Sequence, residues 1–358
     1  MIFPPRGAWP TDGLGMNPRD IIRRPGGPTP PPARRPSRET PKSAFPHLCT
    51  PSAAATRPLR PKTLPRFRVP FFSTPIVSGL IRIFSDLHYG DRSSRLRRLD
   101  QLSPLLDGIS RLILNGDTLD TRPGPHPQVT ARSRAEVGRF FGTCAPEVTL
   151  VTGNHDPDIS DLDTLDLFNG QVFVTHGDII FDNIVPWGRD AATLEAHITR
   201  GLASLPVEHR TQLAPRLAVF RAACAALPQR HQSEPNPLKY AVKFAADTVW
   251  PPLRSFDIIR AWRETPKRAA IIAAAHRPAA RFMLIGHTHR PFVWTAPSGL
   301  TVINTGALCR PFGAQAVDLT PGRLTIRQIE SRSGSFHPGR VVAEFALAEV
   351  PASSNIPA

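Results

Sequence analysis

The sequence predicts an α/β protein whose short strands end in polar clusters and whose second half carries a block of helices. Short β-rich apolar runs recur along the chain, and five of them are followed directly by Asp, Asn or His. Between residues 186 and 280 the spacing becomes helical, as at Leu194, Ile198, Leu202 and Leu205. With 358 residues, 41% of them hydrophobic, the chain is long enough to bury a sizeable core.

The N-terminal residues 1–75 differ from the rest in composition. They hold 18 of the 41 prolines and 13 Lys/Arg against 3 Asp/Glu. Few apolar residues are present to offset the entropy of ordering, so we expect a disordered, Pro/Arg-rich extension. Its Arg-rich, acid-poor character also resembles an organelle transit peptide, and an over-extended start codon is a further explanation. Residues 346–358 are expected to form a flexible tail.

The charge and cysteine patterns limit the classes of function and the cellular setting. The net charge of +15 arises largely from residues 1–75 and from residues 189–280, where 14 Lys/Arg face 7 Asp/Glu. Neither segment interleaves aromatic residues for base stacking, which disfavours nucleic acid as the partner. The four cysteines form no Cys-x-x-Cys pair, so we expect a reducing, cytoplasmic setting. No apolar run is long enough to span a membrane, although peripheral membrane contact stays open.

The elements can be assigned in order from these patterns. Short apolar runs predict strands over residues 80–85, 111–114, 148–152, 171–175 and 281–285, with closing strands over 300–304, 314–319 and 324–329. Leucines between residues 96 and 106 approach helical spacing but are interrupted by Pro104. Residues 157–170 are rich in turn signals. Further helices are expected over 130–141 and, inside the 186–280 insertion, around 208–226, 238–249 and 253–277.

Polar side chains follow five of these strands where each one ends. Because the carboxyl ends of strands in α/β sheets form ligand crevices, the clusters are expected to converge. Asp-x-His and His-x-His spacing predicts two ligands on the same side of an extended backbone, since residues i and i+2 of a strand point to one face. The set contains carboxylates, an amide and imidazoles but no thiolate, which suits two metal ions sharing a carboxylate and the hydrolysis of a phosphate ester. The residues are Asp86, His88, Asp117, Asp120, Asn154, His155, His176, His287 and His289.

As an ordered set these motifs resemble the calcineurin-like metallophosphoesterase superfamily. They read Asp86-Leu87-His88, Gly116-Asp117-x-x-Asp120, Gly153-Asn154-His155-Asp156, His176-Gly177 and Gly286-His287-x-His289. The resemblance implies a four-layer α/β/β/α sandwich of two mixed sheets, with residues 76–185 and 281–345 as the catalytic domain and 186–280 as a helical cap.

The resemblance also implies a role for each motif residue. Asp86, His88 and His289 would hold one divalent ion, Asn154, His176 and His287 a second, and Asp117 would bridge both. Manganese is the first choice of metal, with iron and zinc as alternatives. His155 would assist the leaving group, and Asp120 would orient His155 and raise its pKa. Asp156 could support His155 or only cap a turn, and Arg290 could end its strand or contact phosphate.

The reaction implied is hydrolysis of a phosphate ester or pyrophosphate through attack by a metal-bridging hydroxide. The motifs His176-Gly177-Asp178 and Gly286-His287-Thr288-His289-Arg290-Pro291 resemble those of the UDP-2,3-diacylglucosamine hydrolase branch, which favours a nucleotide-sugar or lipid-linked phosphate as substrate. That branch typically carries arginine where this chain has His155. Basic residues of the insertion, Arg254, Arg260, Arg263, Lys267 and Arg268, could meet phosphates or anionic headgroups. A nuclease of the same superfamily and a non-catalytic binding module remain alternatives, and the oligomeric state is not determined.

Overall fold

The computed structural model describes residues 79–229, 236–249 and 254–348. All of them belong to the second of two units into which the chain divides, Lys62–Ala358. The predicted disordered extension over residues 1–75 lies outside the described residues, as does most of the predicted tail.

Six strands form the first sheet, in the order β11-β10-β9-β1-β2-β3. Strands β1, β2 and β3 run parallel to one another, whereas β9 lies antiparallel to β1 and begins an antiparallel meander through β10 and β11. Three of the five polar loops follow the carboxyl ends of these three parallel strands. The strands are β1 (Ile81–Phe84), β2 (Arg111–Asn115), β3 (Glu147–Val151), β9 (Ala314–Thr320), β10 (Arg323–Arg332) and β11 (Ser335–Ala346).

The second sheet has five strands in the order β4-β5-β6-β8-β7. Strands β5, β6 and β8 are parallel, and an antiparallel strand closes each edge. The sheet is therefore mixed, like the first, and it supplies the remaining two polar loops. Its strands are β4 (Thr164–Leu167), β5 (Val172–Thr175), β6 (Phe282–Ile285), β7 (Phe292–Thr295) and β8 (Thr301–Asn304).

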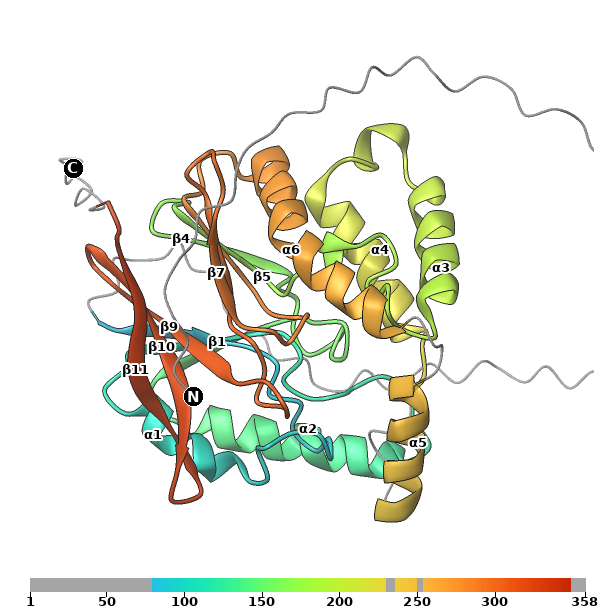
Figure 1. Cartoon of the computed structure of the whole chain (residues 1–358), viewed down its shortest axis with the longest axis horizontal. Coiled ribbons are helices and arrows are strands. Elements are labelled where there is room, and N and C mark those ends of the chain that lie inside the picture. Colours follow the sequence, from blue (N-terminus) through green and yellow to red (C-terminus); the bar gives the residue numbers. More distant parts are fainter. Residues whose placement is uncertain (1–78, 230–235, 250–253, 349–358) are drawn as a thin grey trace, which may run out of the picture. The chain divides into compact units, whose positions relative to one another are not determined.

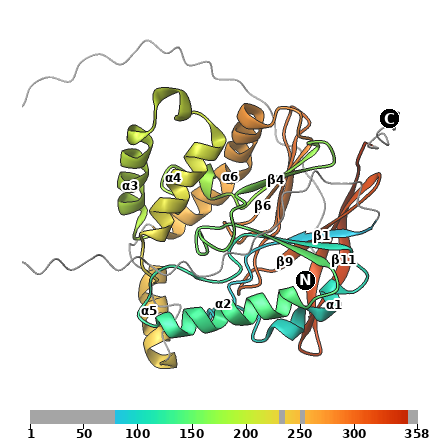
Figure 2. The ribbon, with the colours of Figure 1, turned by 180° about the vertical axis from the view of Figure 1, so that it is seen from behind.

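The two sheets pack face to face, and helices cover their outer faces. Buried residues of the first sheet, such as Ile83 and Ile113, share one apolar cluster with Val174 and Leu284 of the second. Helices α1 (Ser103–Leu106) and α2 (Pro127–Gly142) lie along the first sheet, and three helices of the insertion, α3 (Ala191–Ser204), α4 (Leu213–Ala225) and α6 (Arg254–His276), lie on the second (Figures 1 and 2). The remaining helix of the insertion, α5 (Pro237–Val249), lies beside α2 in both views. The predicted four-layer α/β/β/α sandwich of two mixed sheets is confirmed.

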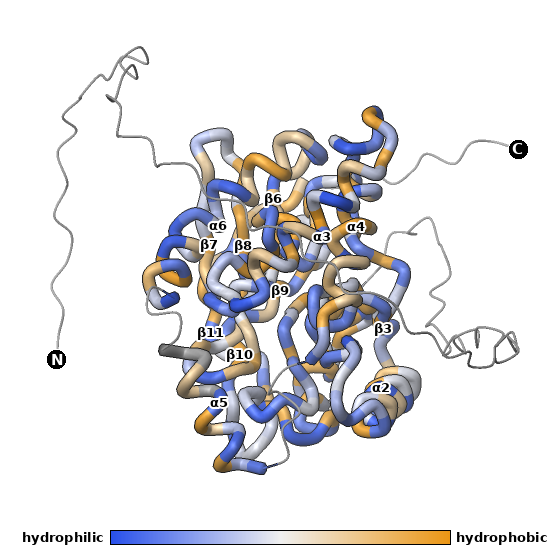
Figure 3. Tube along the Cα trace, turned by 90° about the vertical axis from the view of Figure 1, so that its right-hand side faces the viewer, coloured by the Kyte–Doolittle hydropathy of each residue, from blue (hydrophilic) through white to orange (hydrophobic). Residues whose placement is uncertain are grey.

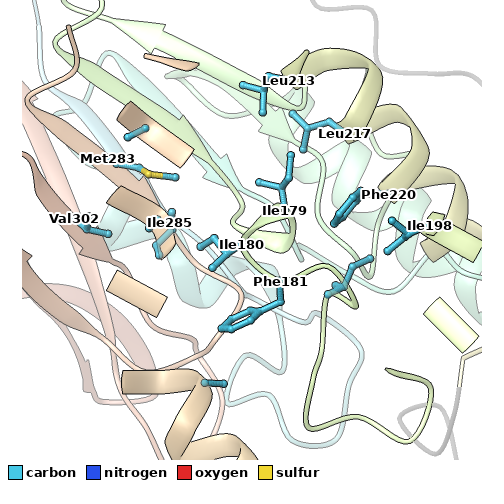
Figure 4. Close-up of a cluster of buried hydrophobic side chains, with 14 of the residues drawn as sticks. Ile179, Ile180, Phe181, Ile198, Leu213, Leu217, Phe220, Met283, Ile285 and Val302 are labelled. Carbon is cyan, nitrogen blue, oxygen red and sulfur yellow. The ribbon is translucent and has the colours of Figure 1, made fainter. Parts of the chain in front are cut away.

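The insertion forms helices α3 (Ala191–Ser204), α4 (Leu213–Ala225), α5 (Pro237–Val249) and α6 (Arg254–His276). Hydrophilic and hydrophobic residues are mixed along α6 (Figure 3). Its buried residues recur every four positions, as expected for a helix with one packed face: Ala261, Thr265, Ala269 and Ala273. Leu217 and Phe220 of α4 point toward Ile179, near Met283 on the second sheet (Figure 4). Three short 3-10 turns complete the elements, at Leu99–Leu102, Asp178–Ile180 and Val207–His209.

Some elements differ from the sequence-based expectation. The segment interpreted as turn-rich contains strand β4, and neither β7 nor β11 was predicted. Strand β11 is an edge strand with Pro338 at a register shift, so its pattern lacks the strict alternation of a central strand. The leucine-rich stretch near residue 100 is helical only from Leu99 to Leu106, with Pro104 inside the first turn of α1, where proline is tolerated.

Among the described residues, no helix is both long enough and apolar enough to cross a bilayer.

Candidate metal centre

Five loops from the two sheets bring the predicted residues together. Each loop follows the carboxyl end of a strand, namely β1, β2 and β3 in the first sheet and β5 and β6 in the second. The apolar strand residues are buried in the cores on either side, so the polar side chains lie where the sheets end. All seven predicted ligands and both predicted catalytic residues stand in these loops, and Asp86, His88, Asp117, Asn154, His176 and His287 are buried.

One group of ligating atoms belongs to Asp86, His88, Asp117 and His289. These residues offer one ligand atom each, and all four atoms lie within 4.8 Å of one another. His289 Nε2 is 3.2 Å from Asp86 Oδ1, and His88 Nε2 is 3.7 Å from Asp117 Oδ2. The two imidazoles bring Nε2 atoms to within 3.0 Å of each other. Such convergence of ring nitrogens and carboxylate oxygens fits a shared cation.

A second group centres on the amide oxygen of Asn154. Its Oδ1 lies 3.1 Å from His176 Nε2 and 2.7 Å from His287 Nδ1. Asp117 Oδ2 is 3.4 Å from His176 Nε2, so this carboxylate reaches both groups. The arrangement brings together the two ligand sets implied by the family resemblance, with Asp117 between them.

The donor chemistry and the packing both fit divalent metal ions. Carboxylate, amide and imidazole donors without thiolate suit manganese, iron or zinc. Two glycines leave room for the ligands. A Cβ at Gly153 would press on the carboxylate of Asp117, and one at Gly286 would press on that of Asp86. Glycine at these two positions therefore lets the carboxylates of Asp117 and Asp86 stay in place, since a larger residue would displace them.

The backbone of the ligand loops differs from the prediction. Extended geometry was expected for the Asp-x-His and His-x-His pairs, but this was wrong. Asp86 (φ 54°), His88 (φ 46°), Asp117 (φ 52°), His287 (φ 66°) and His289 (φ 59°) all adopt left-handed conformations. For residues other than glycine this conformation costs about 1–2 kcal/mol each, which neighbouring contacts must offset. The tight turns, and not a strand pleat, bring the paired side chains to one side.

Electrostatics inside the cluster favour ionised carboxylates. Burial acts to raise the pKa of Asp86, but hydrogen bonds from His289 and His88 outweigh it and hold that pKa well below its usual range. Burial opposes the charge on His88, yet the hydrogen bond to Asp86 and the charge of Asp117 raise the pKa of His88 to about 9. A cation that binds these groups displaces the imidazole protons, since metal ligands must be deprotonated.

His155 lies next to this cluster without belonging to either ligand group. Its ring is 5.0 Å from that of His88, centre to centre, and its backbone N–H donates to Asp117 Oδ1 at 2.8 Å. Its Nδ1 is 3.0 Å from Asp120 Oδ2, as the orienting role of Asp120 requires. The expected rise in pKa is wrong. Burial and the charge of Arg122 lower the pKa of His155 more than its acidic neighbours raise it.

Arg122 is a site residue that sequence reasoning missed. Its guanidinium forms two hydrogen bonds with Asp120, at 3.0 and 2.6 Å, and Nη2 lies 2.8 Å from His155 Nδ1. The sequence held one local signal for this residue, the spacing Asp120-x-Arg122. This spacing places both side chains on one short turn, in which the backbone N–H of Arg122 also donates to the Asp120 carboxylate. Arg122 joins the site as a cation beside His155.

Asp156 supports the loops and not the ring of His155. Its carboxylate accepts backbone hydrogen bonds from Asp117, Thr118 and Gly153 at 2.7–3.0 Å. Burial, with the nearby charge of Asp117, raises the pKa of Asp156 to about 7. The carboxyl group thus joins the second and third motif loops through the backbone.

The helical insertion contacts the fifth motif loop through Trp262 of α6. The indole Nε1 donates to the carbonyl of Thr288 at 3.0 Å, and the guanidinium of Arg290 lies 5.4 Å from the indole centre. Of the basic residues expected to meet phosphate, Arg260 and Arg268 pair with Glu264 instead. Trp262 therefore joins the insertion to the loop that carries His287 and His289.

Solved structures that match this chain share little of its sequence. Three solved structures each cover 75% of it: a predicted phosphoesterase from Streptococcus pneumoniae (13% identity, TM-score 0.32, 98% of that chain), Vacuolar Protein Sorting 29 from Cryptosporidium parvum (13%, 0.34, 99%) and a dimetal phosphatase from Danio rerio (14%, 0.38, 98%). The comparison with curated proteins finds no match.

The match to a family of sequences is more specific. Residues 80–223 match the family model of the calcineurin-like phosphoesterases, and this stretch contains four of the five polar loops. The fifth loop, after β6, completes the same cluster in space. Over residues 80–223 the chain is therefore identified as a calcineurin-like phosphoesterase segment.

Proposed function

We propose that this chain is a dinuclear metal-dependent phosphoesterase that hydrolyses a phosphate ester or pyrophosphate. The observation that carries the proposal is the position of Asp117. Its carboxylate oxygen lies 3.7 Å from His88 Nε2 and 3.4 Å from His176 Nε2, between two sets of ligating atoms. A shared carboxylate is what two neighbouring ions require.

The assignment of ligands follows the two groups. Asp86, His88 and His289 would hold the first ion, Asn154, His176 and His287 the second, and Asp117 both. When bound, two divalent ions supply Lewis-acid stabilisation of phosphoryl oxygens and lower the pKa of a water molecule. Manganese is the metal to supply first, with iron and zinc as alternatives.

The residues of the chain position the substrate and move the proton. In the proposed reaction the protonated ring of His155 lies beside the leaving oxygen and donates the proton that this oxygen needs as its bond to phosphorus breaks. Because burial and the charge of Arg122 lower the pKa of His155, we expect this acid catalysis to be lost as pH rises through that lowered pKa. Asp120 holds the imidazole at Nδ1, which leaves Nε2 to face the substrate. Arg122, in contact with both, adds positive charge next to the departing group.

A nucleotide-sugar or lipid-linked pyrophosphate is the first substrate class to try, on the resemblance of the fourth and fifth motifs. A nuclease activity is the second candidate, favoured by the net charge of +15. DNA affinity that weakens as salt is added would support it, and its absence would remove it. A non-catalytic binding module would need lost ligands, yet all seven positions hold ligating side chains. A cytoplasmic location with peripheral membrane contact stays a prediction.

The test uses Asp117→Asn in the full chain. With Mn²⁺ supplied, the unchanged protein should hydrolyse p-nitrophenyl phosphate, and the variant should lose at least about a hundredfold in kcat/KM, because one neutral amide cannot bridge two cations. Asp107→Asn, at an exposed position after α1, is the matched control and should keep full activity. Activity retained by Asp117→Asn would refute the mechanism.

A further inference from the structure

A pocket of about 170 Å³ lies beside Asn154 and His155, and no residue of the first ligand group is among its described lining residues. Asn154 and His155 form one wall. The opposite wall comes from the insertion and the segment leading into it, including Trp187, Arg189 and Arg254. Because His155 lines this pocket and is also proposed to lie beside the leaving oxygen, the pocket lining bears on the choice of leaving group.

The lining is rich in positive charge. Three arginines, Arg122, Arg189 and Arg254, border the pocket, and Asp190 is the one acidic residue among the lining residues described. Arg122 already pairs with Asp120, and Arg189 donates one hydrogen bond to the carbonyl of Ala246 at 3.2 Å. Each guanidinium carries five N–H donors in a planar fork that matches phosphate oxygens. The cations therefore outnumber the acids around a space next to the reacting centre.

The size of the pocket selects a compact ligand. Pockets that enclose drug-sized molecules measure about 300–1,000 Å³, so 170 Å³ is too little for acyl chains. Trp187 limits the space on one side, with its ring 5.9 Å from that of His287. A small anionic group fits both the charge and the volume.

We propose that this pocket binds a second phosphate group on the leaving side of the substrate, so that the enzyme prefers substrates with two phosphates to monophosphates. The inference rests on the proposed phosphoesterase function and narrows its substrate class. In the reaction, the oxygen of water bonds to the scissile phosphorus and releases one proton to solvent, from which His155 is later reprotonated, and the bond from phosphorus to the leaving oxygen breaks. The leaving oxygen takes a proton from His155 and departs with its own phosphate held by the arginines.

The test compares matched substrates with the Mn²⁺-loaded full chain. Fructose 1,6-bisphosphate is paired with fructose 6-phosphate, and ADP with AMP, so that a distant and an adjacent second phosphate are both sampled. We expect kcat/KM to be at least about tenfold higher for the doubly phosphorylated member of one pair. The double variant Arg189→Gln/Arg254→Gln should reduce that ratio about tenfold, and Arg189→Lys/Arg254→Lys should recover part of it. Arg132→Gln, exposed on α2, is the control and should leave the ratio unchanged.

A binding measurement separates this inference from the proposed function. Calorimetry should show that methylenediphosphonate binds at least about tenfold more tightly than methylphosphonate, and that the glutamine double variant loses this difference. Loss of p-nitrophenyl phosphate hydrolysis with the difference in binding retained would overturn the catalytic role but not the pocket. Equal affinities, or equal kcat/KM values in both substrate pairs, would overturn the pocket.

Discussion

Nη2 of Arg122 lies 2.8 Å from Nδ1 of His155, and the same guanidinium forms a double hydrogen bond with Asp120. The three side chains therefore act as one unit beside the metal centre. Because Asp120 and Arg122 each fix the imidazole partly through the other, removing either one disturbs the same arrangement.

We predict that Asp120→Asn and Arg122→Gln have non-additive effects on catalysis. Each should lower kcat for p-nitrophenyl phosphate by about tenfold or more, and the double variant should lose little beyond the worse single variant. Metal content, measured by elemental analysis, should stay at the wild-type value in all three proteins. Fully additive losses would show that the two residues act independently.

His155→Gln should separate proton transfer from metal binding. Removing a general acid typically costs about 10²–10⁴ in rate, and the loss should be larger for phenyl phosphate than for p-nitrophenyl phosphate, because the poorer leaving group needs the proton more. Bound metal should not change. Equal losses for the two substrates would argue that His155 only positions the phosphoryl group.

Asp156→Ala should destabilise the protein even when no metal is bound. Four backbone N–H groups donate to this buried carboxyl group, and each unsatisfied donor costs about 1–3 kcal/mol. Urea unfolding with chelator present should show a loss of at least about 2 kcal/mol. Asp107→Ala, exposed after α1, serves as the control. A variant as stable as the wild type would mean that water replaces the carboxyl group.

The buried pair of Arg82 and Asp318 joins β1 to β9, with two hydrogen bonds of 2.7 and 2.8 Å. Arg82→Met leaves the carboxylate of Asp318 buried without its main partner, and we expect a loss of about 3–5 kcal/mol in the free energy of unfolding. Arg327 Nε lies 3.3 Å from Asp318 Oδ2 and would still pair with that carboxylate. We therefore expect a loss near the lower end of this range.

Two further variants make the Arg82 prediction specific. The double variant Arg82→Met/Asp318→Leu should recover part of the loss, because no unpaired charge remains in the core. Arg98→Met, which removes a solvent-exposed ion pair with Asp100, should leave urea unfolding nearly unchanged. If Arg82→Met unfolds at the wild-type urea concentration, the buried pair adds nothing to stability.

The parts predicted from sequence are those with a local signal. Apolar runs that end in polar residues placed the five motif-bearing strands, since burial on both faces makes such strands continuous hydrophobic segments. Apolar residues of the insertion recur with the spacing of an α-helix, so its helices were predicted as well. Strand β11 escaped prediction because Pro338 and a register shift interrupt its pattern at the sheet edge, and β4 was too short among turn residues.

The parts that sequence could not provide depend on tertiary contacts. The left-handed backbone at Asp86 and His289 has no sequence signature, because even Asp and His, which enter this conformation more often than most residues, do so in few cases, and the surrounding fold must impose it. The contact of Arg122 with His155 joins loops that are 33 residues apart. The lowered pKa of His155 likewise follows from burial and from Arg122, neither of which Asp120 alone would suggest.

The most direct test of the central claim is the number of manganese ions that the full chain binds after chelator treatment and reloading. We predict two per chain for the wild type, and one for His289→Ala or His287→Ala, since each variant removes a ligand from only one group. A wild-type stoichiometry of one or none, or the same variants binding two, would contradict a dinuclear centre shared through Asp117.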